Sequence, residues 1–425
     1  MSETIQLEAQ MNALGRKSAI AARTLGLASR AQKDAVLLDT AAQLRAQSQD
    51  ILSANAADLK LAEAENLPAA RIDRIMLDEA RLDGIAKALE AIATLPDPVG
   101  ELMQAWTPEH NKLNISRVRV PLGVIGVIYE SRPNVTADAA ALCLKSGNAV
   151  ILRGSSEIMN SAKAIAACFA SALRANGMDE ACVQLVPTAD RAAVGMMLAG
   201  LDNTIDVIVP RGGKNLVARV QDEARVPVFA HLDGVCHTYV HEDADLEMAR
   251  SVVLNAKMRR VGICGATETL LVDSACASTH LKPLIDALEE SGCMVRGDAY
   301  AQAANPKVTP ADEADWFTEY LDSVISVKCV DGLQDAINHI NHYGSHHTDA
   351  IITQNAEAAE IFLNQVDSAI VMQNCSTQFA DGGEFGMGAE IGIATGRFHA
   401  RGPVGLEQLT TFKYVVRGDG QTRPK

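Results

Sequence analysis

One cysteine, Cys264, lies among cations and glycines, a setting that suits a nucleophilic thiol. A free thiol has a pKa near ~8.5 and is mostly protonated at neutral pH, so neighbouring cations favour the reactive thiolate. Lys257 and Arg260 supply such cations, and Gly262 and Gly265 leave room for a substrate carbonyl. Most cysteines are small buried hydrophobes. The surroundings of Cys264 do not fit that interpretation, and we predict that it is catalytic.

Two turns, each between an apolar run and a helical pattern, combine small residues with a cation. Backbone N–H groups and a cation at the start of a helix stabilise a phosphate, although a solvated turn explains each sequence equally well. The absence of Gly-x-Gly-x-x-Gly argues against an ordinary Rossmann fingerprint. The candidate phosphate contacts in these turns are Arg153 and Ser155 in the first, and Arg211, Gly212 and Gly213 in the second.

Asn134 follows a proline and an apolar run that we predict to be the first strand of a sheet. Its side-chain amide can donate a hydrogen bond to an oxyanion. An asparagine in this place also serves as a simple turn residue or as a helix cap. The sequence leaves both roles open.

Four of the ten histidines lie between residues 339 and 347. A metal site is conceivable there, because histidine is a common zinc ligand. Gly344 breaks the helical spacing, however, and we favour an ordinary helix end. The cluster comprises His339, His342, His346 and His347, with Asp349 close by.

Composition limits the class of protein. A chain of 425 residues with 48% hydrophobic residues can build two or three domains without disulfides. Nine cysteines, an odd number without repeated Cys-x-x-Cys spacing, suit a reducing cytosol. The net charge of -15 argues against a nucleic-acid partner. We find no signal peptide and no long apolar span, and we therefore expect a soluble cytoplasmic protein without a membrane partner.

The patterns along the chain predict an α/β fold. Residues 7–95 are helical in composition and period. Five short apolar runs then alternate with helices up to residue 230, the last run being Val226–Ala230, which predicts a parallel sheet covered on both faces. A similar α/β pattern surrounds Cys264. Residues Gln408–Val416 alternate like an edge strand.

Four motifs then carry a resemblance: residues 126–136, 255–272, 344–351 and 400–406. With them the chain resembles, over nearly its whole length, the glutamate-5-semialdehyde dehydrogenase family of the aldehyde dehydrogenase superfamily. The resemblance implies a Rossmann-type nucleotide domain, an α/β catalytic domain and a small oligomerisation flap. The expected parts are residues 1–109 and 122–230 for NADP(H) binding, 231–378 for catalysis with Cys264, and 110–121 with 400–425 for oligomerisation.

The resemblance also implies an activity. This is the NADPH-dependent reduction of L-glutamyl 5-phosphate to L-glutamate 5-semialdehyde and phosphate, in proline biosynthesis, through a thioester on Cys264. It implies that the Asn134 amide shares an oxyanion hole with the Cys264 N–H, that Arg153 reads the 2'-phosphate of NADPH, and that Glu319 holds the nicotinamide ribose. No metal is expected. A homo-oligomer is expected, with a separate glutamate 5-kinase supplying the acyl phosphate.

One departure from the superfamily bears on mechanism. Hydrolytic aldehyde dehydrogenases place a glutamate base in a Glu-Leu-Gly-Gly-like segment, where this chain reads His231-Leu232-Asp233-Gly234. A thioester cleaved by phosphate has less need of a water-activating base. Two alternative functions stay open. The chain is a hydrolytic aldehyde dehydrogenase if Asp233 replaces the glutamate base, or it is a non-catalytic binding protein on the same fold. Lys257 and Arg260 either contact the phosphate or substrate carboxylate, or lower the Cys264 pKa.

Overall fold

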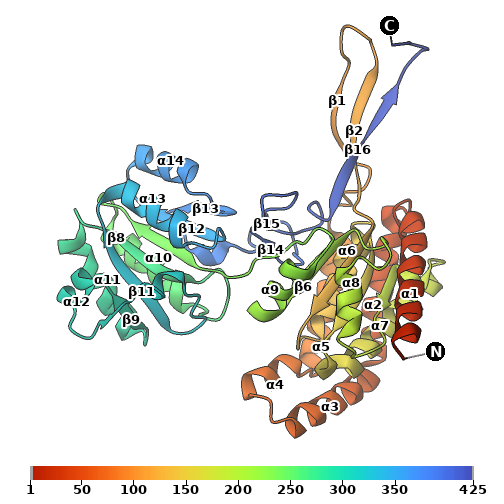
Figure 1. The fold of residues 1–425 in the computed structure, drawn as a ribbon, viewed down its shortest axis with the longest axis horizontal. Helices are drawn as coiled ribbons and strands as arrows, with labels where there is room; N and C mark the ends of the chain where they lie inside the picture. The colour runs from red at the N-terminus through yellow and green to blue at the C-terminus, as the bar shows by residue number, and fades with distance from the viewer. Residues whose placement is uncertain (1–2, 424–425) are drawn as a thin grey trace. The chain divides into compact units, whose positions relative to one another are not determined.

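The computed structural model describes residues 3–423, which fold into two compact units (Figure 1). Of the described residues, the first unit contains 3–229, 387–392 and 404–423. The second contains Ala230–Gly386 and Ile393–Pro403. Within residues 3–423, no helix combines the length and the apolar character needed to cross a membrane.

The first unit begins with five helices, in the region where the composition predicts an all-helical segment. Ser29 caps the second of them in a reciprocal capping box with Gln32, and Asp78 caps the fifth. The second and fifth helices pack together through apolar residues at helical spacing, such as Leu37 and Leu89. The helices are α1 (Glu3–Leu25), α2 (Arg30–Ala46), α3 (Ser48–Ala64), α4 (Ala69–Ile75) and α5 (Glu79–Thr94).

A parallel sheet of four strands follows, in the order β5-β4-β3-β6. In chain order this is 3-2-1-4, the arrangement of the first strands of a nucleotide-binding sheet, whose ligands bind at the carboxyl ends where the order reverses. The strands are β3 (Val124–Tyr129), β4 (Ala149–Gly154), β5 (Val183–Leu185) and β6 (Val207–Arg211). The helices are α6 (Asn134–Lys145), α7 (Met159–Ala175), α8 (Ala192–Leu198) and α9 (Lys214–Glu223).

The fifth apolar run, Val226–Ala230, was predicted to be a full strand, and this is wrong. Only an isolated parallel bridge joins Val228 to Ile208 of β6. Pro227 lies in the run and has no N–H to donate, so the ladder of hydrogen bonds cannot extend along it. The segment therefore lies beside β6 and then leads into the second unit.

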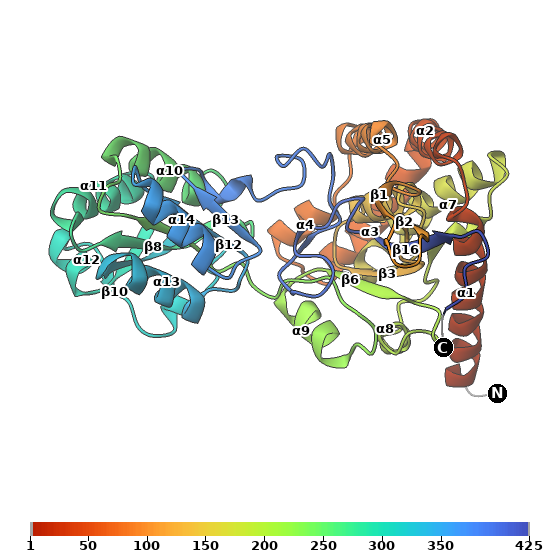
Figure 2. The same ribbon diagram turned by 90° about the horizontal axis from the view of Figure 1, so that it is seen from above.

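The second unit is built on a seven-stranded parallel sheet in the order β10-β9-β11-β8-β7-β12-β13. The central strand β8 is buried on both faces. Leu270 and Val272 pack toward α10 and α11, whereas Leu271 packs toward α13 and α14. The helices α10 and α11 therefore cover one face of the sheet and α13 and α14 cover the other, and all four helices are labelled in Figure 2. Because successive side chains of a strand point to opposite faces, the residues of β8 contribute alternately to two hydrophobic cores, one on each face of the sheet.

The sheet strands of this unit are β7 (Cys236–Val240), β8 (Thr267–Asp273), β9 (Met294–Gly297), β10 (Thr309–Pro310), β11 (Val324–Val330), β12 (Thr348–Ile352) and β13 (Ile370–Gln373). The helices are α10 (Leu246–Met258), α11 (Ala277–Glu290), α12 (Ala299–Ala304), α13 (Gly332–Tyr343) and α14 (Ala356–Gln365). A small antiparallel pair, β14 (Ile393–Ala394) and β15 (Gly402–Pro403), completes it.

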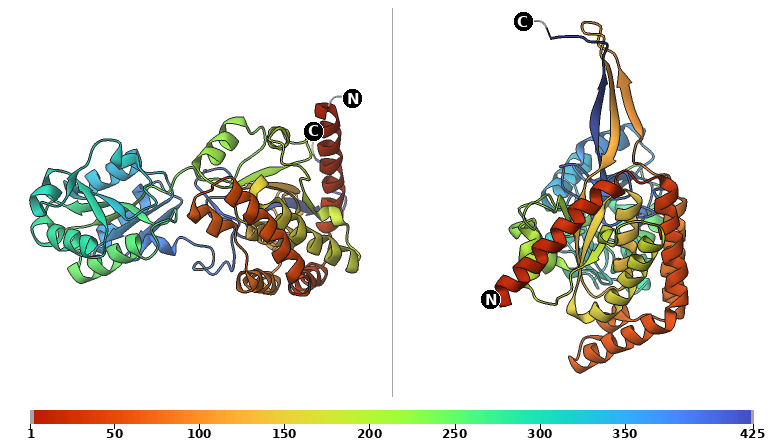
Figure 3. Two further views of the ribbon diagram at one scale, coloured as in Figure 1. Left: turned by 90° about the horizontal axis from the view of Figure 1, so that it is seen from below. Right: turned by 90° about the vertical axis from the view of Figure 1, so that its right-hand side faces the viewer.

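The first unit also carries a three-stranded antiparallel sheet, in the order β1-β2-β16 (Figure 3). Its strands are β1 (Leu102–Trp106), β2 (Asn114–Pro121) and β16 (Thr410–Arg417). The strand predicted near the C-terminus is thus present, paired on one side only among the described residues. Its large apolar side chains are exposed, with Tyr414 at 57% and Val416 at 53%.

Candidate active site

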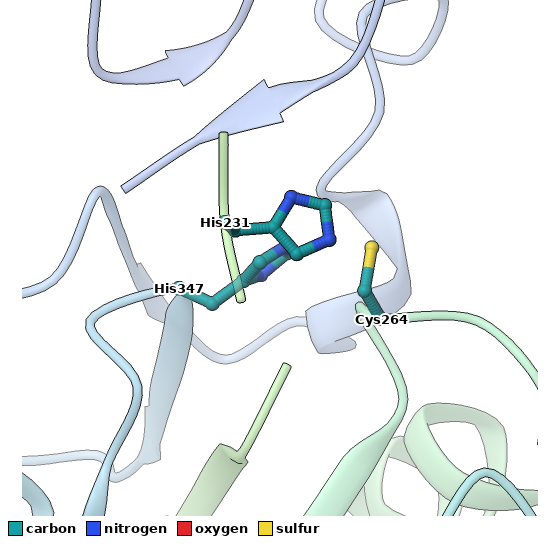
Figure 4. Close-up of side chains that lie close together, drawn as sticks. All are labelled: His231, Cys264 and His347. Atoms are coloured by element: carbon teal, nitrogen blue, oxygen red, sulfur yellow. The ribbon is translucent and has the colours of Figure 1, made fainter. Parts of the chain in front are cut away.

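Cys264 lies at the edge of the second sheet where the amino ends of three neighbouring strands meet. Cys264 comes just before β8, and His347 comes directly before β12. His231 precedes β7, which lies between those two strands. Because the strands are parallel, the loops before them converge at one edge. Figure 4 shows the three side chains together, and their ligand atoms all lie within 4.8 Å of one another.

His231 presents one ring nitrogen to the thiol (Figure 4). Its Nδ1 lies 2.8 Å from the carbonyl oxygen of Ile393. A carbonyl oxygen only accepts, so Nδ1 carries the proton and Nε2 of the neutral ring is an acceptor. His231 can therefore take the proton of the Cys264 thiol. From the sequence, this segment lacks the glutamate base of hydrolytic relatives and offers Asp233 as a substitute, and His231 at its start was not identified as a base.

His347 lies completely inside the second unit. Its Nδ1 is 2.9 Å from Oγ1 of Thr348, and its ring meets that of His231 edge-on, with 4.9 Å between centroids. Burial lowers the pKa of His347 to about 3, so the ring is neutral. Its Nε2 is buried and has no hydrogen-bond partner among the described residues. The site thus combines a thiol with two imidazoles.

Glycine keeps the two loops of this site in contact. A Cβ on Gly234 would lie 2.2 Å from the backbone oxygen of Cys264, so no other residue fits there without a shift. The Gly234 N–H donates to Oε1 of Glu319 at 2.9 Å. The carboxylate of Glu319, for which the family resemblance implies a ribose contact, therefore lies beside the loop that holds Cys264.

The two cations near Cys264 have different surroundings. Lys257 is fully buried and pairs with Glu268, which is also fully buried. Desolvation raises the pKa of Glu268 to about 7, against the pull of Lys257. Arg260 is exposed at the end of α10. The placement of Lys257 favours a structural charge pair over a substrate contact, whereas Arg260 is accessible to an anion.

Asn134 begins α6 in the first unit. Its Nδ2 donates to Oδ2 of Asp138, one helical turn later, at 2.9 Å. Burial raises the pKa of Asp138 to about 6, while the bond from Asn134 and the charge of Arg211 oppose this rise. The amide has a second N–H for another acceptor. Its sharing of an oxyanion hole with Cys264 stays a prediction, since the two residues belong to different units.

Arg153 is the last residue but one of β4, and its side chain is buried. The two terminal nitrogens donate to the carbonyl oxygens of Gly154 and Ala189, each at 3.0 Å. Nε is buried and has no hydrogen-bond partner among residues 3–423. Desolvation lowers the pKa of Arg153, and the nearby charges of Arg191 and Arg219 lower it further. Arg191 and Arg219 are therefore near enough for their charges to act on Arg153 at the carboxyl end of β4. Neither Arg191 nor Arg219 was a candidate from the sequence.

The other candidate contacts lie in turns that already have partners. Ser155 Oγ accepts a hydrogen bond from the N–H of Ser131 at 3.2 Å. The Gly213 N–H donates to Oε2 of Glu130 at 2.9 Å, and a Cβ on Gly212 would lie 2.7 Å from that oxygen. A carboxylate thus lies at the start of α9, where the sequence suggested a phosphate. Arg211, beside this turn, lies against Gly392.

The predicted histidine cluster does not act as one group. His339 is buried beside Lys328, whose Nζ lies 3.2 Å from His339 Nδ1, and His342 is exposed on α13. His346 makes a hydrogen bond to the carbonyl of Asp367. Of these four histidines, only His347 belongs to a possible metal-ligand group in the described part of the chain.

Comparison with known proteins places this site in a family. Residues 8–315 match the aldehyde dehydrogenase family. A gamma-glutamyl phosphate reductase of Parvibaculum lavamentivorans is 64% identical over 414 residues, covering 97% of each chain. One of Paramagnetospirillum magneticum is 61% identical over 424 residues, covering 100% of each. The crystal structure of gamma-glutamyl phosphate reductase from Thermotoga maritima is 42% identical, with a TM-score of 0.95, covering 97% of this chain and 100% of that one. The chain therefore belongs to the aldehyde dehydrogenase family, among its gamma-glutamyl phosphate reductases, as its four motifs predicted.

Proposed function

We propose that this protein reduces L-glutamyl 5-phosphate to L-glutamate 5-semialdehyde, with NADPH as reductant and phosphate as the other product. The observation that carries the proposal is the accessible Cys264 thiol beside His231, in a glycine-lined loop of a chain from this family. A thiol with a proton acceptor at hand is the arrangement for nucleophilic attack on an acyl carbon.

The residues of the chain then have distinct tasks. His231 Nε2 accepts the thiol proton, and the Cys264 sulfur attacks the acyl carbon and forms a thioester. The bond to phosphate breaks, and the proton from the thiol is available to the leaving phosphate. The Cys264 N–H and the Asn134 amide stabilise the oxyanion. Arg260, exposed beside the loop, binds the phosphate or the substrate carboxylate.

NADPH, when bound, supplies the hydride that converts the thioester to the aldehyde. The residues present fit a 2'-phosphorylated nucleotide. Arg153 offers a buried Nε that has no hydrogen-bond partner within the described part of the chain, and the charges of Arg191 and Arg219 add positive potential at this guanidinium. A guanidinium suits a phosphate monoester. The carboxyl ends of β3 and β6, where the strand order reverses, are the ligand-binding edge of such a sheet. Glu319 remains our candidate for the nicotinamide ribose.

The three-stranded sheet supports a homo-oligomer. β16 lies at its edge and exposes Tyr414 and Val416, and an open apolar edge strand invites pairing with another chain. We assign the surface of β16 to contact with a second copy of this chain.

One experiment separates reduction of an acyl phosphate from hydrolytic aldehyde oxidation. In the oxidative direction, semialdehyde and NADP should give NADPH only when phosphate or arsenate is present. The histidine beside Cys264 makes this test informative, because a base can also activate water, and general base catalysis is worth ~10² to 10⁴ in rate. Multiple turnover in phosphate-free buffer, with free glutamate as product, would contradict the proposal and favour a hydrolytic enzyme.

A further inference from the structure

The thiol and the two imidazoles described above also form a set of metal ligands. Among residues 3–423, Cys264, His231 and His347 are the one group of three such side chains whose ligand atoms converge to within 4.8 Å. Zinc prefers sulfur and imidazole nitrogen in a tetrahedral arrangement. Three protein ligands with an open fourth position are the usual composition of an accessible zinc site.

Hydrogen bonds hold both imidazole rings in the orientation that a metal ligand needs. This evidence for a metal site is independent of the cysteine. His347 is fully buried, with Nδ1 at the hydroxyl of Thr348 and a buried Nε2 that has no hydrogen-bond partner in the described part of the chain. His231 donates its Nδ1–H to the carbonyl of Ile393. Metal-binding histidines commonly hold their second nitrogen in this manner, on a carbonyl or another fixed polar group. Nε2 is therefore the ligand atom of each ring in the site proposed here.

We propose that Cys264, His231 and His347 bind one Zn²⁺ ion, which reversibly blocks the nucleophile. Sγ and the two Nε2 atoms are the ligands, the thiol proton passes to solvent, and the fourth position is filled by water. Zinc–ligand bonds of about 2.0 to 2.3 Å place tetrahedral ligands about 3.5 Å apart. The observed spread within 4.8 Å closes to this by small side-chain rotations.

The consequence is a competition at one sulfur atom. A Cys264 thiolate bound to Zn²⁺ cannot attack an acyl carbon, and an acylated Cys264 cannot bind the ion. Zinc binding depends only on the three side chains, so it does not require the proposed reaction to be correct. A failure of either proposal is therefore distinguishable from a failure of the other.

The test measures metal binding directly. Reduced, metal-free protein is titrated with ZnCl2 against a chromophoric chelator, and separately with Co²⁺ as a spectroscopic probe. We expect one ion per chain, a thiolate-to-cobalt charge-transfer band, and protection of Cys264 from alkylation by iodoacetamide. His347→Gln should weaken zinc binding at least tenfold, and Cys264→Ala should remove the charge-transfer band. His342→Gln, which changes an exposed histidine on α13, is the matched control and should bind zinc like the parent.

Two results would overturn the proposal. One is unchanged zinc affinity in both Cys264→Ala and His347→Gln, which would place the ion elsewhere or make it adventitious. The other is a cobalt spectrum without a thiolate band in the parent protein. Because His347 is buried, circular dichroism must show that its variant folds. If that variant does not fold, His231→Gln takes its place, since His231 is only partly buried, and the same criteria apply.

Discussion

Replacing Asp138 by asparagine should stabilise the protein, and the gain should grow with pH. Burial raises the pKa of Asp138 from 3.8 to about 6. A carboxyl with a raised pKa in the folded state costs stability as pH increases, because the unfolded chain ionises first. Each pKa unit is worth about 1.4 kcal/mol, so the cost is roughly 1 kcal/mol at pH 4.5 and roughly 3 kcal/mol at pH 7.5. Asp138→Asn never ionises and escapes this cost.

The pH-dependent part, roughly 2 kcal/mol between pH 4.5 and 7.5, isolates the effect of ionisation from any fixed change in packing. The variant keeps a side-chain oxygen that can accept from Asn134. Calorimetry of both proteins across this pH range should show the melting temperature of the variant rising relative to the parent by about 4 °C, at about 2 °C per kcal/mol for a unit of this size. A difference in melting temperature that does not change with pH would refute the argument that burial raises the pKa of Asp138 in the folded protein.

Four further outcomes follow from the site and the exposed sheet. Cys264→Ser should abolish turnover without loss of NADPH binding, measured by steady-state kinetics and fluorescence titration, because a serine hydroxyl lacks the nucleophilicity of a thiolate at neutral pH. Asn134→Ala should lower kcat by roughly 10²- to 10³-fold with little change in KM, and an unchanged kcat would make Asn134 a turn residue. Arg153→Ser should narrow a preference of kcat/KM for NADPH over NADH, and equal values in the parent enzyme would remove this argument. Tyr414→Glu should yield smaller assemblies by sedimentation velocity, whereas an unchanged assembly would exclude this strand from the interface.

The sequence pointed to Cys264 because its chemistry is local. Cations and glycines within a few positions of a cysteine are visible in the chain itself. His231 and His347 were missed as its neighbours because they depend on the order of strands β8, β7 and β12 in the sheet. No local pattern states that order. The one available signal was His231 itself, in the segment where hydrolytic relatives carry a glutamate base.

The turn before α9 shows a different limit of prediction from sequence: the local pattern was visible, but the group that contacts it was not. Small residues and a cation in Arg211–Lys214 suit a phosphate by type, and the turn does begin a helix. Glu130, far away in sequence, brings a carboxylate to the N–H of Gly213 in this turn, because β3 and β6 are neighbours and end at the same edge. The turn therefore does bind a negatively charged group, but in this structure the group is the carboxylate of Glu130. The phosphate contact stays a prediction.

The register of the sheet explains how the site and the Lys257–Glu268 pair depend on each other. Along β7 and β8, Cys236 pairs with Thr267 and the next residue pairs with Thr269, so Glu268 is an extra residue in the ladder. A bulge of this kind redirects side chains and is common beside active sites. Here it lies next to the Cys264 loop and coincides with the carboxylate that Lys257 holds. The Lys257–Glu268 pair thus stabilises the bulge at the start of β8, and the loop that carries Cys264 leads directly into this strand. This is a physical reason for Lys257 to lie beside Cys264 without contacting substrate.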